Sequence, residues 1–490
     1  MLLRELIQDI SGLRVVGSGN PEILGMAYNS KCVEPGYLFV CLRGTKVDGN
    51  DFIPEALSRG ASAILTDSAS VEADVPILVV ADARAILPKL STRFFGNPSR
   101  RLNIIGVTGT KGKTTTTFLI DSILKEAGLT TGMIGTLGVR IGDEAVSIKN
   151  TTPESLDIQS FFARMISKGV SAATMEVSSH ALVIGRTEGC EFDVGVFTNL
   201  TQDHLDFHGT LDEYFAAKLT LFEEYPLRSG KPFTAVVNLD DPRGSEVLSA
   251  TKGKTLTYGI KSDADINASI ISASANGLIF DVKSPNGAFR VEMSLGGVFN
   301  VYNSLAAIGA ALALGIDIEA ITRGLKKVTS VAGRFVQVNC GQDFGVVIDF
   351  AHTPDSLENI LRASRELCTG RLILVFGCGG DRDRGKRPIM GRIGAEMADV
   401  CLITSDNPRS EEPDAIIAEI LGGANGKSAE VECIVDRREA IVRALGIAAP
   451  GDLVLIAGKG HENYQIFKDR TVHFDDEEVV REVLGCIANQ

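Results

Sequence analysis

The chain has 490 residues, of which 44% are hydrophobic and 23% are charged, a composition typical of globular proteins. At roughly 150 residues per domain, this length predicts about three domains. The net charge of −13 argues against a protein that binds nucleic acid or an anionic membrane without specificity. The nine cysteines form no CxxC pair, no stretch of 18 apolar residues occurs, and residues 1–20 lack a leader pattern. We therefore expect a reduced, cytoplasmic monomer with no membrane or nucleic-acid partner.

The first unit, residues 1–100, is expected to be a small α/β domain. Strands are predicted at 35–42, after a Pro-Gly turn, and at 61–66 and 75–80. Helical spacing covers 83–95, and a Gly-Asn-Pro-Ser sequence ends it. No catalytic constellation is visible in this unit, so we interpret it as a structural or substrate-gripping domain.

A second unit, residues 101–333, opens with an apolar strand and a Gly/Thr-rich loop that leads into a helix through 116–127. Such a loop presents backbone N–H groups to phosphate oxygens, while Lys113 can reach the outer phosphates and the Thr114 hydroxyl can bind Mg²⁺. The usual first glycine of a phosphate loop is replaced by Val107, and the turn glycine lies inward at Gly109. The alternative is an ordinary Gly-rich turn, but Gly-Lys-Thr-Thr after a strand favours nucleoside triphosphate binding.

The rest of the second unit alternates strands and helices. Strands are predicted at 172–175, 194–197 and 234–237, an antiparallel flank at 255–291, and a helix at 300–314. This pattern indicates a mostly parallel sheet with its site at the carboxyl edge. Residues 331–334 are expected to form a hinge.

Two segments after predicted strands carry metal-binding chemistry. Glu176 follows the strand at 172–175, where such folds hold Mg²⁺, although it could instead be a structural carboxylate that caps a helix. Residues 198–208 contain two His and two Asp, including His204. A zinc site or a solvated polar turn is possible there, but the oxygen-rich surroundings favour Mg²⁺ or Mn²⁺ with one His as an accessory ligand.

Lys218 lies at a position where a core residue is expected. On a helix spanning 211–222, Leu211, Phe215, Lys218 and Phe222 are spaced four, three and four apart, as in an apolar stripe. Burial would lower the pKa of the amine and allow it to add CO₂ and form a carbamate, a metal ligand. Spacing alone leaves open a lysine that reaches solvent or pairs with a carboxylate.

The third unit, residues 334–490, alternates again, with strands predicted at 346–349, 372–376, 400–404 and 453–456. Helices are predicted to start near residues 355, 388, 414 and 437. Each strand ends in polar residues, and parallel strands bring such ends to one crevice. Arg382 and Arg409 can bind carboxylates, and Asp406 and Glu462 can bind an ammonium. Any one of these residues could form a surface ion pair, but four of them at converging strand ends favour a binding site for a zwitterionic substrate.

Together these motifs resemble the Mur ligases, the ATP-dependent amino-acid-adding enzymes of peptidoglycan synthesis. The resemblance covers essentially the whole chain, and the motifs that carry it are Gly-Val-Thr-Gly-Thr-Lys-Gly-Lys-Thr at 106–114, Asn-Thr-Thr-Pro at 150–153, Met-Glu-Val-Ser-Ser-His at 175–180, Asp-His-Leu-Asp-Phe-His-Gly at 203–209, Lys218, Asn-Val-Tyr-Asn at 300–303, Asp-Phe-Ala-His-Thr-Pro-Asp at 349–355 and Asp-Asn-Pro-Arg at 406–409. It implies an α/β fold of three domains: a smaller N-terminal domain that binds a UDP-sugar (1–100), a central P-loop ATPase domain (101–333) and a Rossmann-like C-terminal domain that binds the amino acid (334–490).

The resemblance also implies a role for each matching residue. ATP would be bound by Gly109, Thr110, Lys111, Gly112, Lys113, Thr114, Thr115, Asn303, Arg334, Asp349 and His352. Thr114, Glu176, His204 and a carbamylated Lys218 (N6-carboxylysine) would hold Mg²⁺, and Lys113, Glu176, His204 and Lys218 would form the catalytic set. UDP-N-acetylmuramoyl-L-Ala-D-Glu would be bound by Ser30, Asn150, Thr151, Thr152, Ser178 and Arg186, and meso-diaminopimelate by Arg382, Asp406, Asn407, Arg409, Gly458 and Glu462.

The expected reaction is amide formation through an acyl phosphate, with Arg409 pairing with the distal carboxylate that lysine lacks. Departures from the family pattern occur at Lys111, where Asn is usual, at Thr45-Lys46, and at Ile184, where a polar contact is common. A folylpolyglutamate-synthetase-like or lysine-adding ligase, and a nucleotide-binding scaffold without catalysis, are the alternatives.

Overall fold

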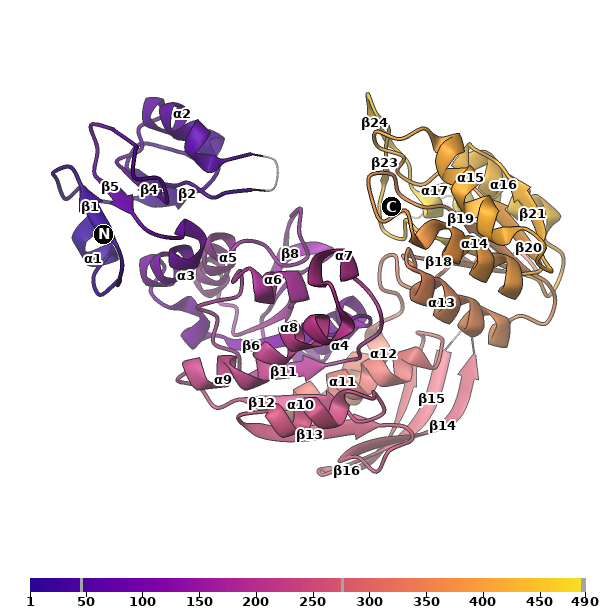
Figure 1. Cartoon of the computed structure of the whole chain (residues 1–490). Coiled ribbons are helices and arrows are strands. Elements are labelled where there is room, and N and C mark those ends of the chain that lie inside the picture. Colours follow the sequence, from indigo (N-terminus) through magenta and orange to yellow (C-terminus); the bar gives the residue numbers. More distant parts are fainter. Residues whose placement is uncertain (45–46, 275–276, 486–490) are drawn as a thin grey trace.

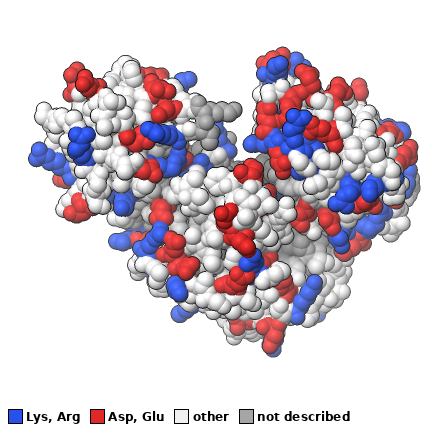
Figure 2. All heavy atoms as spheres, in the orientation of Figure 1, with Lys and Arg blue, Asp and Glu red and all other residues white. Residues whose placement is uncertain are grey.

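The structure is a computed structural model that describes residues 1–44, 47–274 and 277–485. Thr45 and Lys46, one of the departures from the family pattern, lie outside the described residues. The described part contains three large sheets, each covered by helices, one for each expected unit. The N-terminal and C-terminal sheets lie on opposite sides of the central one (Figure 1), and the space-filling view shows a notch between these two outer lobes (Figure 2).

The N-terminal sheet has the strand order β1-β5-β4-β3-β2 over the residues described. Its elements are α1 Leu3–Leu6, β1 Arg14–Val16, β2 Gly25–Ala27, β3 Tyr37–Val40, α2 Ile53–Ser58, β4 Ala63–Thr66, β5 Ile77–Val79 and α3 Ala83–Phe94. All pairs are parallel except β1 with β5. Asp82 starts α3 by accepting hydrogen bonds from the backbone N–H groups of Arg84 and Ala85. The three strands and the helix predicted here are confirmed.

The central sheet has the order β16-β15-β14-β13-β12-β11-β6-β10-β7-β8-β9 within the described ranges. Its strands are β6 Asn103–Thr108, β7 Thr131–Gly135, β8 Gly138–Ile141, β9 Glu144–Val146, β10 Ala172–Glu176, β11 Val194–Phe197, β12 Thr234–Asn238, β13 Lys254–Gly259, β14 Ile266–Ser274, β15 Gly277–Ser284 and β16 Gly287–Met293. The middle strands are parallel, and antiparallel hairpins extend both edges. The predicted antiparallel flank is therefore wrong for its first strand, because β13 pairs parallel to β12.

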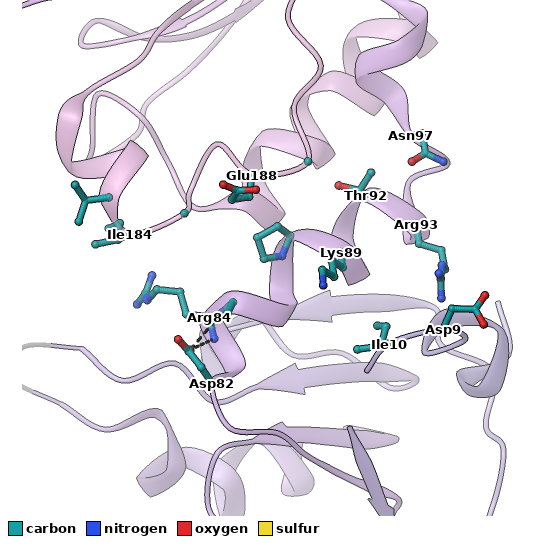
Figure 3. Close-up of a pocket in the computed structure, with 15 residues that line it drawn as sticks. Asp9, Ile10, Asp82, Arg84, Lys89, Thr92, Arg93, Asn97, Ile184 and Glu188 are labelled. Carbon is teal, nitrogen blue, oxygen red and sulfur yellow. Dashed lines mark hydrogen bonds between the residues drawn. The ribbon is translucent and has the colours of Figure 1, made fainter. Parts of the chain in front are cut away.

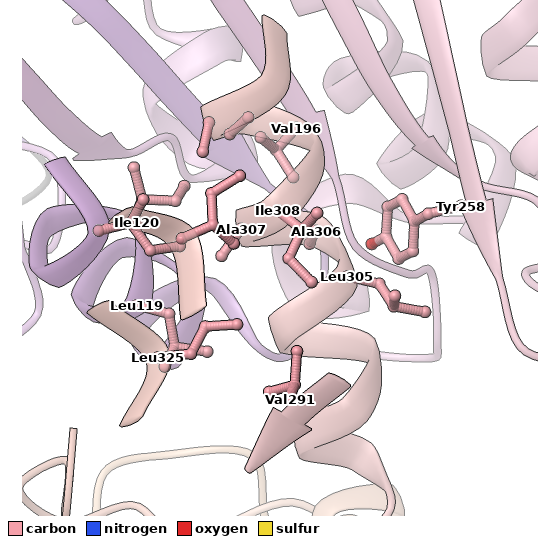
Figure 4. Close-up of a cluster of buried hydrophobic side chains, with 14 of the residues drawn as sticks. Leu119, Ile120, Val196, Tyr258, Val291, Leu305, Ala306, Ala307, Ile308 and Leu325 are labelled. Carbon is pink, nitrogen blue, oxygen red and sulfur yellow. The ribbon is translucent and has the colours of Figure 1, made fainter. Parts of the chain in front are cut away.

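Helices cover both faces of the central sheet. They are α4 Lys113–Glu126, α5 Ser155–Ser167, α6 Ser179–Val183, α7 Leu205–His208, α8 Leu211–Glu223, α9 Tyr225–Arg228, α10 Gly244–Ala250, α11 Phe299–Ala313 and α12 Ile318–Lys327. Successive residues of β6 alternate between the faces, so Ile105 packs in one core and Ile104 in the other. In the first core, Leu119 of α4, Ile308 of α11 and Leu325 of α12 pack together (Figure 4). This packing fixes α4, and with it the loop that precedes it.

The C-terminal sheet has the order β17-β18-β22-β19-β20-β21 in the described part of the chain. Its elements, with a separate hairpin β23-β24, are β17 Val336–Gln337, β18 Gly345–Asp349, α13 Pro354–Leu367, β19 Leu372–Phe376, α14 Lys386–Met397, β20 Val400–Ile403, α15 Pro413–Ala424, β21 Glu430–Cys433, α16 Arg437–Ile447, β22 Leu453–Ala457, β23 Tyr464–Ile466, β24 Thr471–His473 and α17 Asp476–Val483. The strands β18, β22, β19, β20 and β21 are parallel. The four predicted strands therefore end at one edge, as expected.

Three local expectations need correction or completion. The helix after the phosphate loop starts at Lys113 rather than near residue 116, so Lys113 and Thr114 lie in its first turn. Leu211 is 38% exposed and does not belong to the buried stripe of α8. Seven cysteines of the described part are free thiols, whereas Cys340 is disulfide-bonded, which its spacing did not predict. Among the residues described, no helix is both long and apolar enough to cross a membrane.

Candidate active site

The phosphate loop lies between β6 and α4 and is held from behind by the end of β11. The backbone N–H of Lys111 donates to Asn199 Oδ1 at 2.9 Å, and Thr198 Oγ1 donates to the Lys111 carbonyl at 2.6 Å. A Cβ on Gly109 would lie 1.9 Å from Thr198 Oγ1, and Gly109 has a φ of +146°. Only glycine fits there, so the inward shift of the turn glycine from residue 107 to 109 is a requirement of close packing.

Lys113, at the start of α4, has its ammonium folded against the loop. Its Nζ donates to the carbonyl oxygens of Gly109 and Thr110 at 2.9 and 2.8 Å. Burial lowers the pKa of this lysine, and the nearby Glu176 carboxylate opposes that effect. The lysine that we expect to bind phosphate therefore lies against the loop.

A group of oxygen atoms converges next to this lysine. The Thr114 hydroxyl lies 3.0 and 3.1 Å from the two Glu176 carboxylate oxygens. Glu176, at the end of β10 and 2% exposed, also accepts the Thr136 backbone N–H at 2.8 Å. A buried carboxylate beside a helix-start hydroxyl is the hard oxygen donor set that Mg²⁺ prefers, so these residues fit the expected ion. Thr136 was not predicted, since nothing in the sequence places β7 beside Glu176.

Lys218 is 1% exposed, which decides the question that its spacing left open. Its Nζ donates to the Gly109 carbonyl at 2.9 Å and lies 4.2 Å from the centre of the Tyr214 ring. A capping box between Thr210 and Glu213 starts α8 and thereby sets this position two turns later. Burial first, and the Lys113 charge second, hold the pKa of Lys218 well below its usual value. The lysine does not reach solvent, and within the described part of the chain it forms no ion pair with a carboxylate.

His204 is not joined to Glu176 or Lys218 by a direct contact. Its side chain is 45% exposed, and its ring centroid lies 4.7 Å from that of His180 and 6.1 Å from that of Tyr214. His208, from the same segment, bonds Ser179 Oγ at 2.9 Å instead. Within the described residues, no three His, Cys, Asp or Glu side chains form a ready metal site. The expected role of His204 therefore needs a further ligand to bridge the gap, which a carbamate on Lys218 could supply.

The other expected nucleotide residues come from α11 and from the connection to the C-terminal sheet. Asn303 packs on the loop, since a Cβ on Gly112 would lie 2.4 Å from its Oδ1. Arg334 Nη2 donates to Thr114 Oγ1 at 3.3 Å, while its guanidinium lies 5.0 Å from the Phe350 ring centre. The structure thus brings Arg334 of the expected hinge directly to the phosphate loop.

Asp349 and His352 follow β18, next to Arg334. Asp349 accepts the Phe335 backbone N–H at 2.8 Å, and burial raises the pKa of its carboxyl. The His352 ring is tilted by 57° against the Phe350 ring, with the ring centroids 4.5 Å apart, and burial lowers the pKa of His352 to about 4.

The residues expected to bind the nucleotide-sugar peptide lie in or beside one cluster of the central unit, except for Ser30. Thr152 Oγ1 lies 3.2 Å from Ser178 Oγ, Thr151 Oγ1 lies 3.1 Å from Thr136 Oγ1, and Arg186 donates to the Thr152 carbonyl at 3.2 Å. Asn150 is exposed beside this cluster. Ser30 lies in the N-terminal unit, where its hydroxyl donates to Glu55 at 2.6 Å.

A cleft of about 830 Å³ lies beside this cluster, between α3 and the turn after α6 (Figure 3). Arg84, one of its lining residues, donates to Glu154 at 2.7 Å, and Arg186 donates to the same carboxylate at 2.9 Å. Ile184 also lines the cleft. Ile184, where a polar residue is common in the family, therefore places an apolar side chain at the junction of the N-terminal and central units.

The expected amino-acid pocket is assembled at the ends of β20 and β22. Asn407 Nδ2 donates to Glu462 Oε2 at 2.8 Å, and a Cβ on Gly458 would lie 2.8 Å from Asp406 Oδ2. Arg409 Nη1 donates to the Gly380 carbonyl at 2.8 Å. Arg382 is exposed and flanks the same glycine turn. A Cβ built on Gly379 would lie 2.8 Å from Arg409 Nη1 and 3.6 Å from Arg382 Cγ.

Two residues that were not predicted complete this pocket. Lys459 is fully buried and donates to the Tyr464 carbonyl at 2.5 Å, and its Nζ lies 3.5 Å from Glu462 Oε2. The Tyr464 hydroxyl lies 3.4 Å from Glu462 Oε1. Lys459 stands in the Gly-Lys-Gly-His-Glu segment, where its charge was visible but its burial was not.

Comparison with known proteins agrees with this arrangement. Three family models match: the Mur ligase middle domain over residues 107–311, the Mur ligase glutamate ligase domain over 333–460, and the Mur ligase family catalytic domain over 22–95. The chain is 47% identical over 483 residues to a UDP-N-acetylmuramoyl-L-alanyl-D-glutamate–2,6-diaminopimelate ligase of Geobacillus thermodenitrificans, covering 98% of this chain and 99% of the relative. It is also 47% identical over 486 residues to the enzyme of that name from Syntrophomonas wolfei, covering 99% of both.

A solved structure named for the same ligase superposes with a TM-score of 0.69 at 33% identity, covering 99% of both chains. Sequence identity at this level over the full length, together with the three matching models, shows the family. The chain belongs to the Mur ligase family and has its three-domain α/β architecture.

Proposed function

We propose that this protein is an ATP-dependent ligase that joins meso-diaminopimelate to UDP-N-acetylmuramoyl-L-alanyl-D-glutamate, a step of peptidoglycan synthesis. The observation that carries the proposal is the convergence of Lys113 and Lys218 on one loop carbonyl beside the Thr114–Glu176 pair. This arrangement suits phosphoryl transfer from a nucleoside triphosphate. The names of the Geobacillus thermodenitrificans and Syntrophomonas wolfei relatives supply the substrates.

In this proposal the three substrates are divided among the units, and the nucleotide-sugar and ATP each contact two units. Residues 1–100 hold the uridine end of the nucleotide-sugar through Ser30, and residues 101–333 hold ATP on the phosphate loop, Asn303 and Arg334. Residues 334–490 hold the diamino acid and add Asp349 and His352 to the nucleotide site. Asn150, Thr151, Thr152, Ser178 and Arg186 hold the peptide end of the nucleotide-sugar.

Thr114 and Glu176 would hold Mg²⁺, with a carbamylated Lys218 and His204 as further ligands. When bound, Mg²⁺ neutralises charge on the triphosphate and on the transferred phosphoryl group. Lys218 gains its carbamate when its neutral amine adds CO₂ and releases one proton. The change turns a neutral amine into an anion next to Lys113, where a second ammonium would be repelled.

Catalysis then proceeds in two steps. The D-glutamate carboxylate attacks the γ-phosphorus of ATP, giving an acyl phosphate and ADP, while the Lys113 ammonium stabilises the negative charge on the transferred oxygens. An amine of the diamino acid, held by Asp406 and Glu462, attacks the acyl carbon, loses a proton and displaces phosphate to leave the amide. The C-terminal unit brings this amine to the acyl phosphate and excludes water.

Arg409 would set the choice of amino acid. Its guanidinium can bind the distal carboxylate of diaminopimelate, which L-lysine lacks. Removing this pairing should weaken discrimination more than it weakens ATP use.

The test is amino-acid-dependent phosphate release with ATP, Mg²⁺ and the nucleotide-linked dipeptide, comparing meso-diaminopimelate with L-lysine. We expect turnover with diaminopimelate that is lost in Arg409→Ala and partly kept in Arg409→Lys. Turnover with lysine instead would contradict the role of Arg409 and support a lysine-adding ligase. No turnover with either amino acid would support a nucleotide-binding scaffold.

A further inference from the structure

Lys111 of the phosphate loop reaches across to the C-terminal unit. Its ammonium forms an ion pair with Asp355 Oδ2. Thr201 Oγ1, from the segment after β11, donates to the same carboxylate oxygen at 2.9 Å. Two groups of the central unit therefore hold one carboxylate of the C-terminal unit.

Asp355 is rigidly placed at the start of α13. Thr353 caps this helix and Pro354 occupies its first turn, so the carboxylate of Asp355 lies at the positive end of the helix dipole. Asn359, one turn later, donates to Asp355 Oδ1 at 3.3 Å. A carboxylate fixed in this way transmits its contacts to the whole helix.

The Lys111 end is also fixed by its backbone, which Thr198 and Asn199 hold at both its N–H and its carbonyl. Only the side chain can move. Its ammonium extends from a loop that would surround phosphate oxygens, so a bound triphosphate offers it a second, more highly charged anion.

The contact differs from an ordinary surface ion pair. The Lys111 and Asp355 side chains are only 27% and 33% exposed, and burial lowers the pKa of Lys111 to about 7. In a partly desolvated setting an ion pair is screened less by water and salt than at the surface.

We propose that Asp355 is a positioning residue that holds α13 against the phosphate loop through Lys111 and Thr201, and that the triphosphate of ATP competes with Asp355 for Lys111. This inference rests on the proposed function, because it gives the nucleotide a way to free the C-terminal unit for its closing movement. ATP competes with Asp355 for Lys111, so the carboxylate lowers the apparent affinity for nucleotide.

The sign of this effect separates the proposal from a merely structural role. Replacing Asp355 by Asn removes the competitor, so a non-hydrolysable ATP analogue with Mg²⁺ should bind about three- to five-fold more tightly by calorimetry. Deuterium uptake at the start of α13 should rise without nucleotide. A residue that only stabilised the site would weaken binding when changed.

Asp414→Asn is the matched control, since Asp414 follows Pro413 at the start of α15 in the same way and is exposed. It should leave nucleotide affinity unchanged. Lys111→Asn supplies the second test: in that background Asp355→Asn should change the affinity less than twofold.

Unchanged or weaker binding in Asp355→Asn, or an equal gain in Asp414→Asn, would overturn the proposal. These measurements need no amino acid and no turnover, so normal nucleotide binding without ligase activity would count against the proposed function alone. If the unaltered chain bound no ATP analogue, the result would contradict both the proposed function and the proposed role of Asp355.

Discussion

Lys113 Nζ and Lys218 Nζ both donate to the carbonyl oxygen of Gly109, each at a distance of 2.9 Å. Two ammonium groups at one acceptor repel each other. Burial lowers the pKa of both lysines, and it holds the pKa of Lys218 well below its usual value. The pair is therefore electrostatically unfavourable as two cations. Conversion of one amine to an anion would relieve it.

We predict that Lys218 carries a carbamate. Protein equilibrated with ¹³CO₂ should show a carbamate carbon signal by NMR that is absent in Lys218→Arg. Activity of that variant should fall about 100-fold or more, since it loses an anion beside the transferred phosphoryl group. Lys252→Arg, at an exposed lysine, should keep both the signal and the activity. A fully active Lys218→Arg protein would contradict the modification's role.

Glu176→Gln should raise the Mg²⁺ concentration needed for half-maximal activity by about 10- to 100-fold. The glutamine carries no charge, and its NH₂ group cannot accept the Thr136 backbone N–H as a carboxylate oxygen does. A Mg²⁺ titration of phosphate release checks this, with Glu144→Gln at an exposed site as the control. An unchanged Mg²⁺ requirement would mean that Glu176 is a structural carboxylate.

Lys459→Met should raise the KM for diaminopimelate about tenfold while leaving the KM for ATP unchanged. The substitution leaves the Tyr464 carbonyl without its donor, which costs ~1–3 kcal/mol, and frees Glu462 to move. Steady-state kinetics with each substrate varied in turn measures the split. Lys468→Met, at an exposed lysine, should behave as the parent chain, and an equal rise in both constants would point to general disruption.

Acid stability should depend on the Arg387–Glu411 contact beside the proposed amino-acid pocket. Hydrogen bonds from the Arg387 guanidinium, and then the Asp381 backbone N–H, lower the pKa of Glu411 to about 2 from its usual 4.5. A carboxyl whose pKa is lower in the folded than in the unfolded state stabilises the fold at pH values above its unfolded-state pKa. This stabilisation is lost as the pH falls to the folded-state pKa. The Tm difference between the parent and Glu411→Gln should therefore be constant above about pH 5 and shrink towards pH 2. A difference that grew on acidification would contradict this.

Much of the fold was predictable from strand-length apolar runs and punctuating glycines. Segments such as 194–197 and 372–376 coincide with β11 and β19, because fully buried parallel strands are continuous apolar runs. Short edge elements were missed, among them β9 and β21, whose residues are partly exposed and carry no such signal. The parallel pairing of β13 was missed because local sequence does not specify a strand's partner.

The positions of candidate site residues could be predicted where a motif fixed both the residue type and the local geometry, as at Lys113 and Glu176. Helical periodicity placed Lys218 at a core position but left its burial open, and its carbonyl partner, 109 residues away in sequence, could not be inferred. Asp355 stood within a recognised motif, yet its contact with Lys111 depends on how two units meet. Contacts between units depend on tertiary packing, and the spacing of residues in the sequence does not predict them.

The central claim is that the peptide carboxylate is activated by phosphoryl transfer before it meets the amine. The most direct measurement supplies the nucleotide-linked dipeptide with ¹⁸O in its reacting D-glutamate carboxylate, with ATP, Mg²⁺ and meso-diaminopimelate, and analyses the released phosphate by mass spectrometry. We predict one ¹⁸O atom in each phosphate released with the amide product. Unlabelled phosphate alongside amide formation would contradict the acyl-phosphate route.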